Sequence, residues 1–167
     1  MILKKFSKDF YTSLIITVLI FILDRISKNY VIGLSNEDTP TQIFSSKFLN
    51  INLIWNDGIA FGLFSFESNH LYNILTIIIL IVILLVFIML INSKSYKKYA
   101  LTMILGGAIG NFYDRIIYKA VPDFIDFHIG EFHWFIFNLA DIFITLGVIF
   151  MISLEFIGIN NKNHEKN

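Results

Sequence analysis

Residues 71–91 read LYNILTIIILIVILLVFIMLI, and this stretch decides the class of fold. It contains no Asp, Glu, Lys or Arg and is dense in Ile and Leu. At about 1.5 Å of rise per residue, a helix of this length crosses the roughly 30 Å hydrocarbon core of a bilayer. The stretch therefore predicts a transmembrane helix, and its freedom from charged residues suits a scaffold.

The composition of the whole chain agrees with this prediction. Of the 167 residues, 56% are hydrophobic and only 16% are charged, and the mean hydropathy is +0.68. These values are typical of a polytopic membrane protein. The formal net charge is zero, so we expect no basic surface for nucleic-acid phosphates and no nucleic-acid partner. The sequence has no cysteine, which excludes disulfides, thiolate metal sites and cysteine nucleophiles.

The remaining apolar segments are interrupted by polar residues. They lie at residues 10–32, 99–118 and 134–157. The sequence thus predicts an all-α polytopic membrane protein with four transmembrane helices, in one domain over residues 1–167 with an external loop region at 34–69. The interruptions are Asp24 and Lys28 in the first helix, Asn111, Asp114 and Arg115 in the third, and Asn138 and Asp141 in the fourth. Ionisable groups inside apolar helices are costly, so they indicate a function.

Lysine placement predicts the orientation. With four helices, both termini and the segment at 92–98 share one side, and this side holds Lys4, Lys5, Lys8, Lys94, Lys97, Lys98, Lys162 and Lys166. The opposite loops hold only Lys47 and Lys119 clear of the helices. Positive charge in short loops marks the cytoplasm, so we expect both termini there. All three polar clusters and the 34–69 region then lie near the outer face.

Each polar motif also has a structural interpretation. Asp24 and Lys28 are one helical turn apart, so a structural ion pair explains them as well as chemistry does. Asn56-Asp57-Gly58 favours a hairpin turn between strands at 48–54 and 59–61. Glycines 106, 107 and 110 indicate close helix packing.

The carboxylates are less easily explained by structure. Asp114, Asp123, Asp126 and Asp141 could all reach the outer boundary. Two carboxyl groups close together in a low-dielectric site cannot both ionise easily, so one of them can act as an acid and the other as a base toward an amide. An extended chain places Asp126 and His128 on one side and Asp123 on the other, which argues against a metal cluster. The residues alone do not select the partner of Asp141.

Five ordered motifs carry a family resemblance. They are Asp24-x-x-Ser27-Lys28, Asn56-x-Gly58-x-Ala60-Phe61-Gly62, Gly106-Gly107-Ala108-x-Gly110-Asn111-x-x-Asp114-Arg115, Val121-x-Asp123-Phe124-Ile125 and Phe137-Asn138-x-Ala140-Asp141. In order and spacing they closely resemble the lipoprotein signal peptidase (signal peptidase II) family. The resemblance implies a four-helix aspartic protease of the bacterial inner membrane, with a small extracytoplasmic β-cradle between the first two helices. The implied substrate is a diacylglyceryl-modified prolipoprotein, cleaved just before its lipidated cysteine.

The resemblance also implies residue roles. Asp123 and Asp141 become the catalytic pair, supported by Asn56, Asn111, Asp114, Arg115 and Asn138, while Asp24, Lys28 and Gly110 hold the architecture. No metal or other cofactor is expected, and the partners are the lipidated substrate and membrane lipids, with the protein acting as a monomer. Pro122 departs from the family pattern, which usually has Val there. Proline lacks the backbone donor and fixes φ, so the conformation beside Asp123 is left open.

Two other classes of function fit parts of the sequence. A small proton-coupled transporter would also bury Asp24, Asp114 and Asp141, although residues 71–91 offer it no polar path. A non-catalytic assembly or lipid-binding membrane protein would explain the glycines but not the convergent acids and amides. Cleavage of a lipidated prolipoprotein by the purified protein would separate the enzyme from both.

Overall fold

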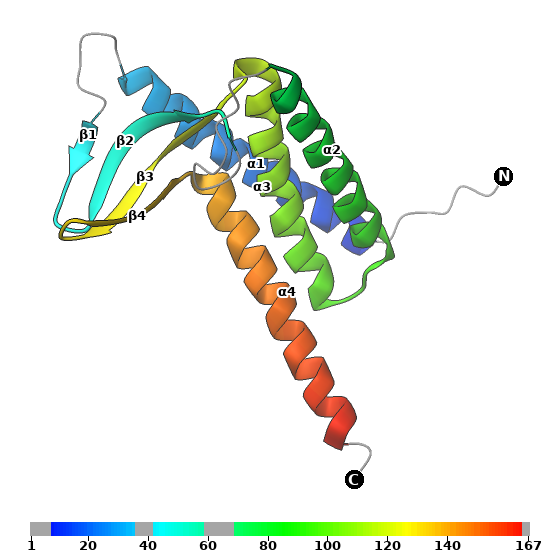
Figure 1. Cartoon of the computed structure of the whole chain (residues 1–167). Helices are drawn as coiled ribbons and strands as arrows, with labels where there is room; N and C mark the ends of the chain where they lie inside the picture. Colours follow the sequence, from blue (N-terminus) through cyan, green and yellow to red (C-terminus); the bar gives the residue numbers. More distant parts are fainter. Residues whose placement is uncertain (1–7, 36–41, 59–68, 165–167) are drawn as a thin grey trace.

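The structure is a computed structural model that describes residues 8–35, 42–58 and 69–164. These residues form four helices and four strands, in the order α1 (Lys8–Leu34), β1 (Gln42–Ser45), β2 (Leu49–Asn56), α2 (Asn69–Asn92), α3 (Tyr96–Tyr118), β3 (Val121–Ile129), β4 (Phe132–Phe137) and α4 (Leu139–His164). The strands make one sheet beside one end of the helices, and α4 extends away from that end past the others (Figure 1).

Two expectations about the fold are wrong. The chain is mostly helical with a small sheet, and β1 and β2 lie between α1 and α2 as expected, but β3 and β4 come from the connection between α3 and α4. The fourth helix begins at Leu139 and not at 134, since FHWFIF at residues 132–137 forms β4. Aromatic and β-branched side chains favour a pleated strand, and their apolar character makes them look continuous with the helix that follows.

The sheet has the strand order β1-β2-β3-β4, and all its pairs are antiparallel. The predicted hairpin between 48–54 and 59–61 is only partly described. β2 covers the first strand and Asn56 Oδ1 accepts a bond of 3.0 Å from the Gly58 amide, as in an Asx-turn, but residues 59–61 lie outside the described residues. The strand neighbours of β2 in the described chain are β1 and β3.

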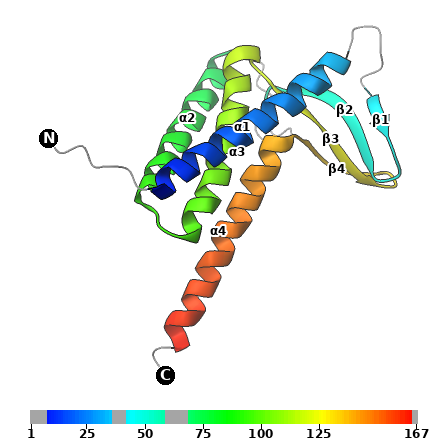
Figure 2. The ribbon, with the colours of Figure 1, turned by 180° about the vertical axis from the view of Figure 1, so that it is seen from behind.

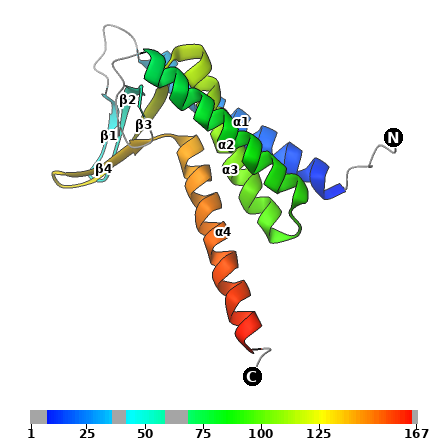
Figure 3. The same ribbon diagram turned by 45° about the vertical axis from the view of Figure 1, so that its right-hand side comes forward.

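Three described helices are long and apolar enough to cross a membrane: Lys8–Leu34, His70–Asn92 and Leu139–Ile157. The third helix of the chain, α3, packs against α1, α2 and α4, and the views from behind and from the side show it among them (Figures 2 and 3). Buried Ile83 and Leu90 of α2 join Leu101 and Leu105 of α3 in an apolar core. The least apolar of the four described helices is therefore the one that packs against the other three.

Glycines let α3 approach the elements that carry the acids. A Cβ at Gly107 would collide with the backbone carbonyl of Ala140 on α4, the residue before Asp141. A Cβ at Gly110 would lie 2.6 Å from Oδ2 of Asp24 on α1. The packing interpretation of the glycines is thus confirmed, and it positions two carboxylates.

The sheet is fixed to the helices by a second apolar cluster. Val31 near the end of α1 is buried together with Leu53 of β2 and Phe124 of β3. Because Phe124 follows Asp123, this contact holds the acid-bearing part of β3 against the end of α1. The sheet thereby brings a carboxylate from outside the helices to the start of α4.

Candidate active site

The start of α4 is a reciprocal cap built by Asn138 and Asp141. Asn138 Oδ1 accepts a bond of 3.2 Å from the Asp141 amide, while Asp141 Oδ2 accepts one of 3.1 Å from the Asn138 amide. This is the arrangement of a capping box, with Asp in the place of the usual Glu. It fixes the Asp141 carboxylate in the first turn of the helix, where the macrodipole favours negative charge.

Asp123 reaches the same residue from β3. The side-chain amide of Asn138 donates to Asp123 Oδ1 at 2.6 Å, and that of Asn56 donates to Oδ2 at 2.8 Å. Asp123 is only 4% exposed. Asn138 therefore binds both acids, and each oxygen of Asp123 is held by one N–H donor.

The environment of Asp123 favours its protonated form. Burial raises the pKa of the Asp123 carboxyl to about 6, and the negative charge of Asp141 adds to the rise. The amide donors of Asn56 and Asn138 lower this pKa and oppose the rise, because they stabilise the carboxylate. A carboxyl that changes protonation near neutral pH can serve as an acid or a base.

Asp141 is also held from α3. The Asn111 side-chain amide donates to Asp141 Oδ1 at 2.7 Å, and its oxygen accepts a bond of 2.8 Å from Lys28 Nζ on α1. The asparagine thus connects the acid to a buried cation. Lys28 orients Asn111, and Asn111 orients Asp141.

Behind this connection lies a buried cluster of four charges, which we call the charge cluster: Asp24, Arg25, Lys28 and Asp114. Lys28 Nζ contacts Asp24 at 3.0 Å and Asp114 at 2.7 Å. Arg25 bonds both oxygens of Asp114, at 2.5 and 2.8 Å, and one oxygen of Asp24 at 2.6 Å. Asp24, Lys28 and Asp114 are fully buried, and two cations balance two anions. Asp24 also accepts a bond of 3.2 Å from the Ala140 amide, which ties the cluster to α4.

The ion-pair interpretation of Asp24 and Lys28 is confirmed, but the sequence missed Arg25. Its neighbours in the charge cluster include Asp114, which is remote in the chain, so spacing along α1 gives no sign of the contact. An arginine beside an aspartate inside an apolar helix was the available signal.

Arg115 lies apart from the charge cluster. Its guanidinium donates to the backbone carbonyls of Asn111, at 3.2 Å, and Gly58, at 3.1 Å. Its own carbonyl accepts a bond of 3.3 Å from the Tyr72 hydroxyl on α2. The Arg115 Nε is buried without a hydrogen-bond partner. Arg115 therefore joins α3 to the turn after β2 and carries a positive charge close to the acids.

Pro122 lies at a position of β3 that is compatible with proline. It is fully buried and lies opposite Trp55 of β2, whereas the pairing of β3 with β4 is recorded from Ile125 onward. Proline is compatible with a strand where one side has no ladder partner. Asp123 consequently keeps an extended backbone next to a residue that offers no amide.

Three cavities meet around the acids. Asp123 borders a cavity of about 390 Å³ together with Asn56 and Asp57. Asp141 borders two others of about 310 and 410 Å³, and the larger of these is lined mostly by apolar residues of α2, α3 and α4, with Arg115 and Asn111 in its wall. Trp134 and Phe135 of β4 line both the Asp123 cavity and the smaller Asp141 cavity. The two acids thus lie between a polar space and apolar ones.

Comparisons with known proteins identify the family. The model of the family described as signal peptidase (SPase) II matches residues 16–157. The chain is 49% identical over 160 residues to the lipoprotein signal peptidase of Pelagibacter ubique (strain HTCC1062), covering 96% of both chains. It is 43% identical over 150 residues to the lipoprotein signal peptidase of Anaplasma marginale (strain Florida), covering 89% of this chain and 86% of the relative.

A solved bacterial membrane enzyme, determined by the in meso method at 2.3 Å, has a similar fold. It superposes with a TM-score of 0.72 at 34% identity, covering 90% of this chain and 91% of that one. The family match covers α2, α3 and the whole sheet, together with α1 from residue 16 and α4 to residue 157. The chain therefore belongs to the signal peptidase II family and is a peptidase of the bacterial inner membrane.

Proposed function

We propose that the protein is an aspartic endopeptidase that removes the signal peptide from diacylglyceryl-modified prolipoproteins, cutting just before the lipidated cysteine. Asp123 and Asp141 are its catalytic pair. The observation that carries this proposal is that Asn138 binds both carboxylates at the junction of the sheet and α4. The lipoprotein signal peptidases that the chain resembles support the choice of substrate.

The two acids divide the work of adding water to an amide. The ionised member takes a proton from water, whose oxygen then attacks the carbonyl carbon. The protonated member donates to the carbonyl oxygen and stabilises the tetrahedral intermediate. The C–N bond breaks when one acid protonates the leaving nitrogen and the other carboxylate takes a proton from a hydroxyl of the intermediate, so that the pair again holds one proton. Each carboxylate is held by two N–H donors, so the reaction begins from a fixed geometry.

The cavities support a substrate that is part peptide and part lipid. The scissile peptide fits the polar side, where Asn56 and Asp57 border the space in front of Asp123. Apolar walls lead from Asp141 along α2, α3 and α4, where acyl chains can stay in contact with lipid. Asn111 and Arg115 stand where this apolar space meets the acids.

We place all four helices across the membrane, with both termini in the cytoplasm and the acids near the outer face. The burial of α3 among three apolar helices supports this arrangement, because its polar residues then face protein and not lipid. The acids and the amides that hold them come from a single chain, which supports a monomer as the working unit.

Direct cleavage tests the proposal. The purified protein in detergent should cleave a diacylglyceryl-modified prolipoprotein and leave the same precursor without the lipid uncut. Mass spectrometry should place the new amino terminus at the lipidated cysteine. Absence of cleavage, with the family's fold intact by circular dichroism, would reject the proposal and favour a transporter or an assembly protein.

The orientation gives a separate prediction. The native chain has no cysteine, so single cysteines report position directly. Ile129→Cys, on the 65% exposed tip of β3, should react with a membrane-impermeant maleimide in intact spheroplasts. Ser95→Cys, exposed between α2 and α3, should react only after permeabilisation. The reverse pattern would invert the topology.

The amide donors of Asp123 give a pH prediction. Asn56→Ala removes a donor that lowers the pKa of Asp123, so this pKa should rise further. In a coupled pair the rise increases the sum of the two apparent pKa values, and the optimum of a bell-shaped profile lies midway between them. If loss of the Asn56 donor raises the pKa of Asp123 by about one unit, which corresponds to about 1.4 kcal/mol, the pH optimum of cleavage should rise by about half a unit.

The matched control for this prediction is Asn52→Ala on the same strand. The Asn52 side-chain oxygen is buried without a hydrogen-bond partner, so the substitution removes an amide without touching the acids. Its pH optimum should equal that of the native protein. An unchanged or lowered optimum in Asn56→Ala would show that Asn56 does not hold the carboxylate form of Asp123.

A further inference from the structure

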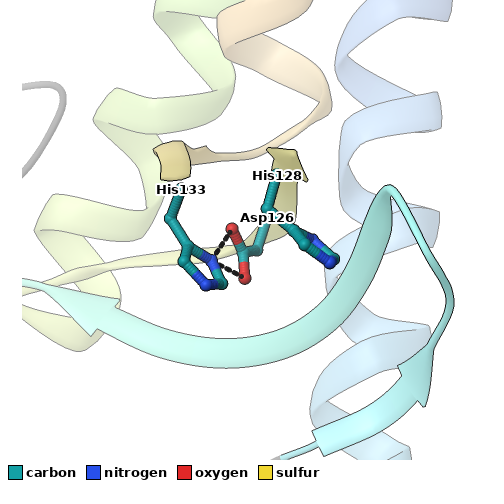
Figure 4. Close-up of side chains that lie close together, drawn as sticks. All are labelled: Asp126, His128 and His133. Carbon is teal, nitrogen blue, oxygen red and sulfur yellow. Dashed lines mark hydrogen bonds and ion pairs between the residues drawn. The ribbon is translucent and has the colours of Figure 1, made fainter. Parts of the chain in front are cut away.

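We propose that the sheet binds one divalent transition-metal ion of the Zn²⁺ class, between Asp126 and His128 of β3 and His133 of β4. This site is separate from the acid pair and takes no part in peptide hydrolysis. The three side chains lie close together there: Asp126 and His133 face each other, and the His128 ring lies on the other side of Asp126 (Figure 4).

Strand register brings the three side chains together. His128 and His133 are directly paired across the β3–β4 ladder, and their rings stack with centroids 5.0 Å apart. Asp126 precedes His128 by two positions, so both point to the same face of β3. The expectation against a metal cluster considered Asp126 and His128 with Asp123 on the opposite side; the strand β4, which was not predicted, supplies His133 instead.

The spacing suits a small metal ion. One ligand atom from each residue lies within 4.8 Å of the other two. His133 Nδ1 is 2.9 and 3.0 Å from the two oxygens of Asp126. Ligand atoms in a tetrahedral zinc site with bonds of about 2.0–2.1 Å lie about 3.3 Å apart. The distance between Asp126 and His133 is already near that value. Rotation of the His128 ring would bring one of its nitrogens to a similar distance from both.

A second observation points to a ligand at this place. The Nδ1 atom of His128 is buried and has no hydrogen-bond partner. A buried ring nitrogen without a partner costs free energy, and a metal ion would satisfy it. Two imidazoles and one carboxylate are also the donor set that Zn²⁺ accepts most readily, with a fourth position left for water.

The surroundings support binding. The Asp126 carboxylate is nearly buried, and the Asn50 side-chain amide of β2 donates to it at 3.3 Å, which orients it. The His133 side chain is 51% exposed, so an ion can enter without opening the sheet. A bound ion would clamp β3 to β4, and β4 leads directly into Asn138. Its expected effect is to stabilise the sheet that carries Asp123.

Metal binding can be measured directly, without any cleavage assay. Protein purified in detergent through a tag that contains no histidine, and then freed of metal with chelator, should bind one Zn²⁺ per chain by isothermal titration calorimetry. Zn²⁺ should raise its thermal unfolding temperature, and Co²⁺ should give the visible absorption of a tetrahedral site. His128→Ala and His133→Ala should each weaken Zn²⁺ binding at least tenfold and abolish the rise in unfolding temperature.

The control is His70→Ala, at the start of α2, which should leave Zn²⁺ affinity unchanged. The half-exposed His133 can be replaced without leaving a cavity, and the metal-free unfolding temperature verifies that each variant is folded. Absence of stoichiometric binding by the native protein would overturn the proposal. So would equal binding by His133→Ala, which would reduce the Asp126–His133 contact to an ion pair only.

Discussion

Asp123→Asn and Asp141→Asn are each expected to lower the rate of prolipoprotein cleavage by about 10³-fold or more, with folding and substrate binding retained. Asparagine preserves the size of the carboxylate but cannot exchange its proton, and general acid–base catalysis contributes about 10²–10⁴-fold. The measurement is the single-turnover cleavage rate of each purified variant on the lipidated precursor, alongside its affinity for that precursor.

Because the two acids act as a unit, the double variant should be little slower than either single one. Glu131→Gln, in the exposed turn between β3 and β4, removes a carboxylate that lies outside the pair and should cleave at the native rate. Normal cleavage by Asp123→Asn together with an inactive Asp114→Asn would show that Asp123 is not the partner of Asp141.

The second large effect concerns the charge cluster. Asp114→Asn should lower the free energy of unfolding by about 3–5 kcal/mol, because it leaves two buried cations with a single anion. Asp114 accepts bonds from both Arg25 and Lys28, and all three groups are buried or nearly so. Thermal unfolding in detergent should show a correspondingly large drop.

Two further variants identify the cause of that loss. Adding Lys28→Met to Asp114→Asn restores the charge balance and should recover part of the stability. Glu155→Gln breaks the exposed ion pair between Lys97 and Glu155 and should cost less than about 1 kcal/mol. If Asp114→Asn were no more damaging than Glu155→Gln, the charge cluster would not hold the helices together.

The helices could be predicted from the sequence because length and apolar character constrain them in a bilayer. The predicted ranges 10–32, 71–91 and 99–118 fall inside α1, α2 and α3, each within a few residues of the observed ends. The start of α4 was predicted too early, since the apolar run from Trp134 continues from a strand into a helix without a break. The pairing of β4 with β3, in a hairpin across Gly130 and Glu131, distinguishes the two, and no turn was predicted there.

Some features of the candidate site could likewise be predicted from the sequence, and others could not. Asn56, Asn111 and Asn138 stand out in the sequence as amides near acids, and the structure joins all three to Asp123 or Asp141. Arg25 could have been noticed as a charge inside an apolar helix, but its partner Asp114 could not be predicted, because that contact depends on how α1 crosses α3. The strand at 48–54 was predicted, but its pairing with β3 was not, because the two strands lie far apart in the chain.

The shared cap at the start of α4 has a consequence for biosynthesis. Asn138 and Asp141 lie at the start of α4, which is synthesised after Asp123 and the charge cluster. Until that helix has formed and its first turn has closed on Asn138, the earlier segments hold only one of the two acids. If Asp123 and Asp141 are the catalytic pair, a chain in which this turn has not yet formed is a scaffold without proteolytic capacity.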